Sequence, residues 1–395
     1  MSTIARLTYV RIVVAAAYLC GILFSHRLWF GAGRTFPRVP LLESLPAFIL
    51  AHDYLLSILL VVALVLSIFS KRPARFLVAI ATLTTLLVVC DVTRLQPWVY
   101  QYVLMLLLLA CRHLRIADAT LGRSVLAANQ LLIVALYFWS GLQKLNWSFA
   151  HEVLPNLLTS AGFQHFQPGA AYVSAAGAAV ALCEASIGVG LFFWRTRKAA
   201  VLIASSLHLV VLLLLILAGS NSVVWPWNVA MLVMIWLLFW REEGSLTNRT
   251  LWQWRSGEVT SHLVATVLIV CGLAPALSFA GWWDMYLSAS LYSGNTPVAV
   301  IQVDENLRSR LPVMAQRQLL TTSRRELMLP LHDWAMAELN VPPYPEDRVY
   351  RQLASQLCSY DHQPHDLLLI VKERPSLLDG SYSVSRTNCR DLLSR

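Results

Sequence analysis

Long apolar runs recur along the first 283 residues of this 395-residue chain. Each run is close to 20 residues long, which at about 1.5 Å per residue is enough to cross a hydrocarbon core ~30 Å thick. The runs predict about nine membrane spans, at 9–29, 49–69, 75–94, 95–114, 124–143, 171–194, 199–218, 223–241 and 260–281. We therefore expect an all-α polytopic helical bundle in a membrane.

Two domains are predicted, because the long apolar runs occupy residues 1–283 and shorter alternating segments follow in 284–395. Residues 297–303 (PVAVIQV) and 366–371 (DLLLIV) alternate as half-buried strands do. Between them, the acidic pair at 346–347 suits a helix N-terminus. The helix that would follow has apolar residues at four-residue spacing, at Val349, Leu353 and Leu357. The second domain is expected to be a small α+β domain.

Composition agrees with a membrane protein and excludes a single soluble globule. Apolar and aromatic residues make up 57% of the chain and charged residues only 13%, against roughly 25% in soluble domains. The net charge of +9 comes from residues 1–283, which hold 19 basic and 9 acidic side chains, whereas 284–395 hold 12 and 13. Because the excess lies beside membrane segments, it is a topology signal and nucleic acid is not an expected partner.

The loops between the predicted spans differ in charge. One set of alternate loops carries 14 basic residues and the opposite set carries 5. By the positive-inside rule, this asymmetry places the N-terminus in the cytoplasm and the C-terminal domain outside the cell's inner (plasma) membrane. The first span follows Arg6 and Arg11 and has no cleavage site of the Ala-x-Ala type, so we expect it to stay as an anchor.

Cysteines divide between the two predicted domains. Five lie in or beside the spans, where they act as small apolar residues. Only Cys358 and Cys389 lie in the second domain, residues 284–395, which we call the tail. If the tail is extracytoplasmic, these two are expected to form a disulfide in an oxidising compartment. Neither belongs to a CxxC motif, and the Cys and His spacing predicts no metal site.

Ionisable residues inside spans are costly, so each is a candidate functional group. Toward the predicted outer face, Asp91 and Arg94 are spaced to form a local ion pair one helical turn apart. His52 and Asp53 fit residues that mark the membrane interface. Lys144 fits equally well a side chain that snorkels outward and a member of an outward-opening site.

Glu184 and His208 lie deeper in apolar runs than the other ionisable residues. One of them could bridge the other, since consecutive antiparallel helices often pack side by side, so a structural clamp and a reactive site are both open. If they are reactive, the residue types suit proton transfer. A desolvated Lys144 would be a base near neutral pH, a buried Glu184 would tend to hold its proton, and His208 could relay protons between them.

The segment 137–147, YFWSGLQKLNW, resembles the segment around the active-site lysine of vitamin K-dependent gamma-carboxylases and of the broader horizontally transferred transmembrane domain family. Downstream, 182–193 (LCEASIGVGLFF) resembles the acid-bearing helix of that family, with Glu184 at the acidic position. The segments 206–208 (SLH) and 225–228 (WPWN) resemble its next two helices. The resemblance covers roughly residues 5–283.

The resemblance implies the family's membrane fold and a role for Lys144 as the base toward a quinol, with Glu184 and His208 near it. The substrate and the cofactor are left open, a quinol or another lipid-soluble molecule being the expectation. The alternative is a non-catalytic scaffold or assembly factor that presents the exported domain to a protein partner. A transporter is disfavoured, because the cytoplasmic halves of the spans are almost purely apolar.

Overall fold

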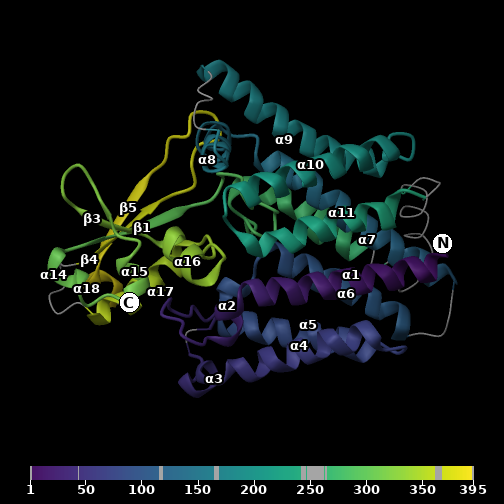
Figure 1. The fold of residues 1–395 in the computed structure, drawn as a ribbon, viewed down its shortest axis with the longest axis horizontal. Coiled ribbons are helices and arrows are strands. Elements are labelled where there is room, and N and C mark those ends of the chain that lie inside the picture. Colours follow the sequence, from purple (N-terminus) through teal and green to yellow (C-terminus); the bar gives the residue numbers. More distant parts are fainter. Residues whose placement is uncertain are drawn as a thin grey trace.

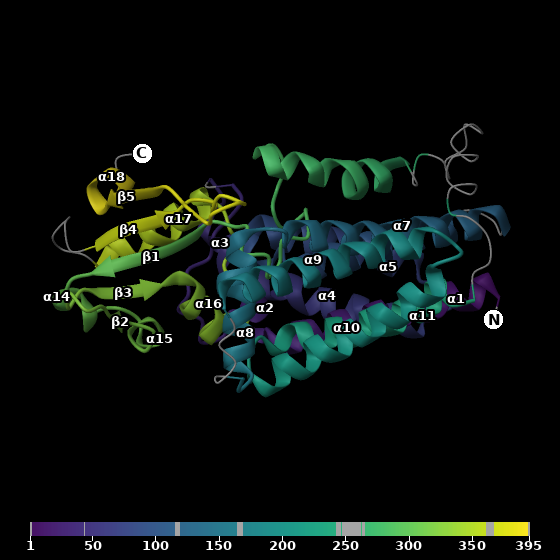
Figure 2. The same cartoon turned by 90° about the horizontal axis from the view of Figure 1, so that it is seen from above.

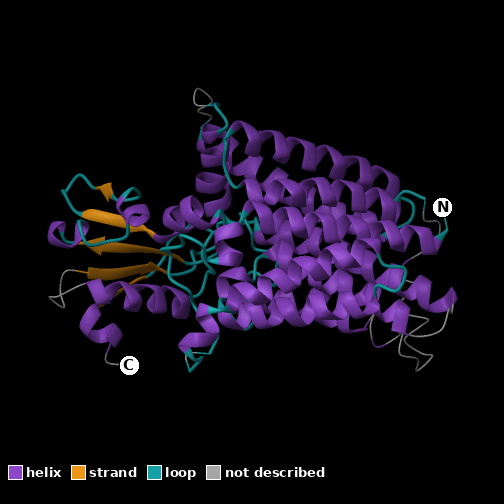
Figure 3. Ribbon diagram, turned by 60° about the horizontal axis from the view of Figure 1, so that its bottom comes forward, coloured by secondary structure: helices purple, strands orange, loops and turns teal. Residues whose placement is uncertain are grey.

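The structure is a computed structural model that describes residues 2–42, 44–114, 119–163, 169–241, 246, 262, 265–360 and 367–393. Within these ranges the protein is mostly helical and has one small antiparallel sheet. The strands gather at one end of the molecule and the long helices at the other (Figure 3). The basic residues Arg115, Arg249 and Arg255, used above to predict the topology, lie outside the described residues.

Most of the helical part lies in the described residues between 2 and 240. Its long helices are α1 (Thr3–Phe24), α4 (Asp53–Phe69), α5 (Ala74–Cys90), α6 (Pro97–Leu114), α7 (Ala119–Gln143), α9 (Ala170–Phe192), α10 (Arg197–Leu217) and α11 (Trp225–Phe239). Its short helices are α2 (His26–Phe30), α3 (Ala47–Ala51) and α8 (Leu154–Ser160). Single turns of 3₁₀-helix occupy Val92–Arg94 and Ser222–Val224, and a π-helix occupies Phe149–Val153.

Five of the described helices are long and apolar enough to cross a membrane. They are the helices at Thr3–Phe24, Gly122–Gln143, Ala170–Phe192, Arg197–Leu217 and Ser222–Phe239. The chain is thus an integral membrane protein by the length and composition of its helices. The other four predicted spans coincide with shorter apolar helices, at Asp53–Phe69, Ala74–Cys90, Pro97–Cys111 and Ala265–Ala280.

The helices form an elongated bundle, with the N-terminus and the sheet at opposite ends (Figure 1). The pair α4 and α5 lies along one side, and α9 and α10 lie along the other. Helix α7 runs between them and is the most buried of the five candidate spans. The helical segment Ala265–Ala280, which ends as a π-helix at Leu268–Leu273 and a 3₁₀-helix at Ala274–Ala280, runs along the outside of the bundle (Figure 2).

The tail forms a five-stranded antiparallel sheet in the order β2-β3-β1-β4-β5. The strands are β1 (Val298–Val303), β2 (Leu320–Thr321), β3 (Leu327–Pro330), β4 (Leu367–Lys372) and β5 (Val384–Asn388). Ile301 lies opposite Leu329 on one side and Leu369 on the other, and all three are buried. Since side chains alternate along a strand, these residues form one apolar face.

Helices cover that apolar face. Helix α16 (Leu331–Leu339) packs on β1 and β3, and α17 (Asp347–Leu357) packs on β4. The small helices α14 (Glu305–Arg308), α15 (Val313–Gln316) and α18 (Cys389–Leu393) and a 3₁₀ turn at Cys358–Tyr360 complete the tail.

The tail contains the elements expected from its sequence and several more. The predicted strand at 297–303 is β1, and the predicted helix is α17, whose Val349, Leu353 and Leu357 are all buried. The predicted strand at 366–371 corresponds to β4, although its first residue lies outside the described residues. Cys358 and Cys389 are joined by a disulfide, with 5.6 Å between their Cα atoms. Helix α16 and strands β2, β3 and β5 were not predicted, because their apolar patterns are short.

A buried carboxylate fixes the tail to the end of the bundle. Glu338 of α16, only 4% exposed, accepts hydrogen bonds from the backbone N–H groups of Thr35 and Phe36, from the Thr35 hydroxyl at 2.7 Å, and from Trp334 Nε1 at 2.8 Å. Four donors satisfy a charge that would otherwise be costly to bury. The tail is therefore bound tightly to the loop that follows α2.

Stability at the junction between the two parts should depend on pH through Glu346. Burial, and then the neighbouring Asp284 carboxylate, raise the pKa of Glu346 above its ordinary value. Because this pKa is raised in the folded state, the contribution to stability is present at low pH and is lost as pH rises through the folded pKa. We expect the melting temperature to fall over that pH range and the fall to be smaller in Glu346→Gln. The exposed Glu305 provides the control: Glu305→Gln should keep the full pH dependence.

Candidate functional site

The candidate site is built on one face of α7. Tyr137, Ser140 and Lys144 are three and four residues apart, so they lie above one another on the same side of the helix. Tyr137 is buried, and Lys144 follows the last residue of α7, Gln143. The sequence thus places a phenol, a hydroxyl and an amine along about 10 Å of one helix face, at 1.5 Å per residue.

Glycines let α9 approach this face of α7 closely. A Cβ atom added to Gly141 would lie 2.2 Å from the backbone nitrogen of Ala185 and 2.6 Å from the carbonyl oxygen of Ala181. At Gly188 of α9, an added Cβ would lie 2.7 Å from the backbone nitrogen of Phe138. Small residues at a helix crossing bring the two backbones together. This close crossing brings Glu184 of α9 beside α7.

The structure joins Lys144 and Glu184 in an ion pair. Lys144 Nζ lies 2.9 Å from one oxygen of the Glu184 carboxylate and 3.1 Å from the other. The amine also donates to Ser140 Oγ at 2.7 Å and to the Ser140 carbonyl oxygen at 3.2 Å. The predicted alternative of a Lys144 side chain that only snorkels outward does not describe this geometry.

The ion pair is shielded but not closed off. The side chain of Lys144 is 11% exposed and that of Glu184 is 14% exposed. The pair places a proton donor, the amine, directly beside a proton acceptor, the carboxylate. The arrangement can thus act as a general base or a general acid toward a molecule that reaches it.

His208 belongs to a neighbouring set of hydrogen bonds. Its Nε2 contacts the Tyr137 hydroxyl, and its Nδ1 lies 2.8 Å from Asn228 Oδ1. The hydrogen bonds of His208 therefore run to Tyr137 and Asn228, and neither of them is the bridge to Glu184 that the sequence left open. Glu184 pairs with Lys144 because the close crossing of α7 and α9 brings its carboxylate into contact with the Lys144 amine.

The C-terminal end of α7 is held by a closed ring of polar contacts with Ser278 and with the tail. Gln143 Nε2 donates to Ser278 Oγ at 2.8 Å, and Gln143 Oε1 accepts from Asn295 Nδ2 at 2.6 Å. Arg374 closes the ring by donating to Asn295 Oδ1 at 2.7 Å and to the Ser278 carbonyl at 2.6 Å. Lys144 directly follows Gln143 in the chain, so these contacts with the tail also fix the turn that carries Lys144.

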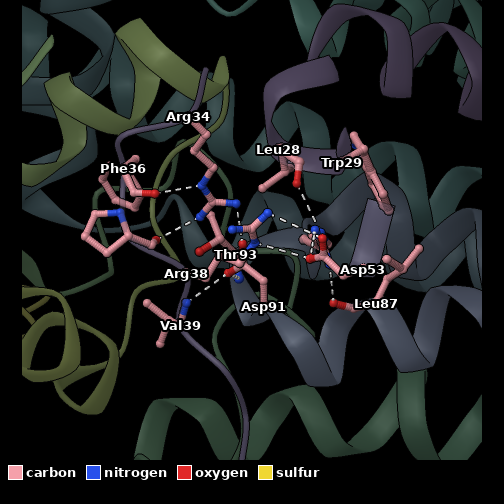
Figure 4. A network of polar contacts seen from close by, with 12 residues as sticks. Leu28, Trp29, Arg34, Phe36, Arg38, Val39, Asp53, Leu87, Asp91 and Thr93 are labelled. Carbon is pink, nitrogen blue, oxygen red and sulfur yellow. Dashed lines mark hydrogen bonds and ion pairs between the residues drawn. The ribbon is translucent and has the colours of Figure 1, made fainter. Parts of the chain in front are cut away.

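A second buried charge network lies at the same end of the bundle (Figure 4). Asp53 and Arg94, both 0% exposed at the side chain, are 2.5 Å apart, and Arg38 lies 3.3 Å from the same carboxylate. Arg34 and Asp91 form a further ion pair at 2.6 Å. Arg94 also donates to the Leu28 carbonyl at 3.1 Å and to the Leu87 carbonyl at 3.0 Å.

This network corrects two predictions. Asp91 and Arg94 do not form the expected local ion pair, because the loop after α2 brings Arg34 to Asp91 while α4 brings Asp53 to Arg94. Asp53 does not mark the membrane interface, since it is buried between two arginines, whereas the neighbouring His52 is exposed. Arg34 and Arg94 also donate hydrogen bonds to backbone carbonyl groups. This indicates a structural role for the network, which fixes α2, α4 and α5 to one another.

A small cavity lies on a different face of α7. Its lining includes Leu132, Leu136 and Trp139 of α7, together with Tyr100 and Cys271. Helix periodicity puts these α7 residues away from Tyr137, Ser140 and Lys144. The cavity is therefore separate from the candidate site.

Sequence reasoning missed two members of the site, Tyr137 and Asn228. Both lie within segments quoted above for the family resemblance, but neither is ionised near neutral pH, so a search for charged groups in spans passes over them. The available signal was the spacing of Tyr137 from Lys144, seven residues or two helical turns. Asn228 gives no such signal, because its position relative to His208 depends on how α10 packs on α11.

The close crossing of α7 and α9 gives a direct test by substitution. Gly141→Ala should destabilise the protein by about 1–3 kcal/mol, since the added methyl group meets backbone atoms of α9 that cannot move independently. Gly122→Ala on the same helix is the matched control, because its added Cβ would meet its nearest atom at 3.9 Å. Denaturant unfolding in detergent measures both. Equal stability of the two variants would contradict the packing described here.

Comparisons with known proteins add no family to this picture. No protein-family model, no curated protein and no solved structure matches this chain.

Proposed function

We propose that this chain is an integral membrane enzyme in which Lys144 and Glu184 transfer a proton to or from a lipid-soluble substrate. The observation that carries the proposal is the ion pair itself, placed between two membrane helices and still partly exposed. A charged pair in such a position costs desolvation energy, and a reactive role explains why it is kept. The function is thus acid–base chemistry at the α7–α9 crossing.

Lys144 becomes a base when its proton passes to Glu184. The two groups are in contact at 2.9 Å, so the transfer needs no intermediate carrier. A neutral amine and a neutral carboxylic acid are less penalised by an apolar environment than two ions. The Ser140 hydroxyl oxygen accepts a hydrogen bond from the Lys144 amine whether the amine is charged or neutral. This bond orients the lone pair of the neutral amine. The substrate proton is then taken by Nζ, and Glu184 releases its proton to the product or to water, which restores the ion pair.

The resemblance to the gamma-carboxylases around Lys144 supports a quinol as the substrate class. A quinol has an acidic hydroxyl group and dissolves in lipid, so it could reach a base between membrane helices.

In the proposed topology the chain has nine spans and a cytoplasmic N-terminus, and the sheet domain lies outside the plasma (inner) membrane. The charge asymmetry of the loops supports this orientation. The opposite positions of the N-terminus and the sheet are compatible with it. Lys144 then lies toward the exported end of the bundle.

The proposal is tested with purified protein in lipid nanodiscs supplied with a short-chain menaquinol. Removal of the quinol proton produces an anion that oxygen can oxidise, so turnover is measured as quinol-dependent oxygen uptake. We expect uptake with the natural sequence and none above background with Lys144→Ala. Lys198→Ala is the control, because Lys198 lies at the other end of the bundle against Trp240. Equal uptake in Lys144→Ala and the unchanged protein would end the proposal.

A second candidate function is a membrane scaffold that presents the sheet domain to an extracytoplasmic protein. It is favoured by the tight attachment of the tail, through Glu338 and through Arg374, which holds the domain at a fixed orientation. In that case the Lys144–Glu184 pair only locks α7 to α9. A scaffold would tolerate any substitution that preserves the ion pair, and an enzyme would not.

A further inference from the structure

The hydrogen bonds around His208 determine where its ring proton lies. Asn228 Nδ2 donates to the Val224 carbonyl at 2.9 Å, so Asn228 Oδ1 is the atom that faces the ring. An amide oxygen can only accept, and His208 Nδ1 must therefore carry the proton. In the neutral ring the other nitrogen, Nε2, is then an acceptor. It follows that the Tyr137 hydroxyl donates its proton to His208.

Three residues from three helices thus stand in the order phenol, base and orienting group. Tyr137 comes from α7, His208 from α10 and Asn228 from α11. A hydroxyl bonded to a histidine that is itself oriented by a third group is the arrangement by which proteins activate a hydroxyl for proton transfer. Tyr137 and Asn228 are buried, so water competes little for these bonds.

We propose that Tyr137, with His208 and Asn228 behind it, is a second proton-transfer group of the same site. The proposal rests on the proposed function, since it adds a relay to the face of α7 that carries Lys144. The two proton-transfer groups are seven residues apart on that helix, or about 10 Å along its axis. A substrate lying against this face can exchange one proton near Lys144 and another near Tyr137.

The relay step is balanced within the chain's own groups. A proton leaves the substrate for the Tyr137 oxygen while the original phenolic proton passes to His208 Nε2. Tyr137 stays neutral, the substrate becomes an anion and His208 becomes an imidazolium. Asn228 Oδ1 continues to accept from Nδ1–H and holds the imidazolium in the same orientation. The reverse sequence delivers a proton to the substrate and restores neutral His208.

A purely structural role for His208 would be served by either ring tautomer. The relay needs one of them, because only an unprotonated Nε2 can take the phenolic proton. Imidazole in water favours the Nε2–H form, so holding the Nδ1–H form requires the specific acceptor that Asn228 supplies. This difference separates a relay from a polar contact that merely joins α7 to α10.

The test combines nitrogen NMR with turnover. Protein labelled with ¹⁵N in its histidine rings is placed in nanodiscs, and the His208 signals are assigned by their absence in His208→Gln. We expect protonated Nδ1 and unprotonated Nε2 in the natural sequence, retention of this form in Asn228→Asp, and a change to Nε2–H in Asn228→Leu. Oxygen uptake with the menaquinol should fall about 10²- to 10⁴-fold in Tyr137→Phe, the range typical of losing one acid–base group.

Each outcome decides between the two proposals. An Nε2–H signal in the natural sequence overturns the relay whatever the substrate is. Full uptake in Tyr137→Phe, together with lost uptake in Lys144→Ala, overturns the relay and leaves the proposed function intact. Full uptake in Lys144→Ala overturns the proposed function and, with it, the catalytic role of Tyr137.

Discussion

Replacing Lys144 by arginine is expected to reduce turnover at least a hundredfold, by about 10²- to 10⁴-fold, while leaving a folded protein. Arginine keeps the positive charge that pairs with Glu184, so the ion pair between α7 and α9 survives. A guanidinium does not give up its proton in proteins and cannot act as a base near neutral pH. We expect oxygen uptake with the menaquinol to fall by about 10²- to 10⁴-fold, the contribution of one general base.

The stability of the same variants separates catalysis from clamping. Lys144→Ala leaves Glu184 without its partner. It should lower the free energy of unfolding by less than the about 3–5 kcal/mol typical of a broken buried pair, because the Glu184 side chain is partly exposed. Lys144→Arg should stay close to the unchanged protein in denaturant unfolding. If the protein is a scaffold, cells that make Lys144→Arg should have the same phenotype as cells that make the unchanged protein. Full turnover in Lys144→Arg would show that the amine is not the base.

The second large effect is expected at Asp53. Asp53→Asn should destabilise the protein by about 3–5 kcal/mol, because it leaves the fully buried Arg94 without its carboxylate and weakens the hold on Arg38. Asparagine has nearly the same shape, so lost packing does not account for the loss. Urea unfolding of the detergent-solubilised protein, followed by tryptophan fluorescence, measures the change.

Exposed ion pairs supply the comparison for Asp53. Glu305 and Arg308 are paired at 3.1 Å, but their side chains are 68% and 53% exposed. Exposed pairs contribute little, so Glu305→Gln should change stability by less than about 1 kcal/mol. If Asp53→Asn were equally mild, the charge network of Figure 4 would not be holding the ends of α4 and α5 in place.

The two predictions rest on different kinds of buried charge. The Asp53–Arg94 pair is fully enclosed, and its arginine is also bonded to backbone carbonyls at 3.0 and 3.1 Å. The Lys144–Glu184 pair is partly exposed and uses a flexible amine. Arginine suits fixed, multiply bonded positions, whereas a lysine can lose its proton when desolvated. This difference is why we propose a structural role for the first pair and a chemical role for the second.

The apolar runs of the sequence were sufficient to predict a membrane protein, and the position of each predicted span coincides with an apolar helix in the structure. Their lengths were less predictable. Among the described helices, α4 and α5 have only 17 residues each, since Ser70, Pro73 and the polar turn at Val92–Arg94 set their ends. In the tail, β1, β4 and α17 followed from local periodicity, because their apolar residues repeat at two or four positions.

By itself, the sequence determined which residues are costly to bury, and so it predicted Lys144, Glu184 and His208 as candidates. It could not determine their partners. Gly141 and Gly188 decide that Glu184 meets Lys144, and the packing of α10 on α11 decides that His208 meets Asn228. Hydrophobic length and charge are properties of a segment alone, whereas an ion pair or a hydrogen bond depends on the distance between two helices. That distance is set by side chains along the whole contact, and only the tertiary structure contains it.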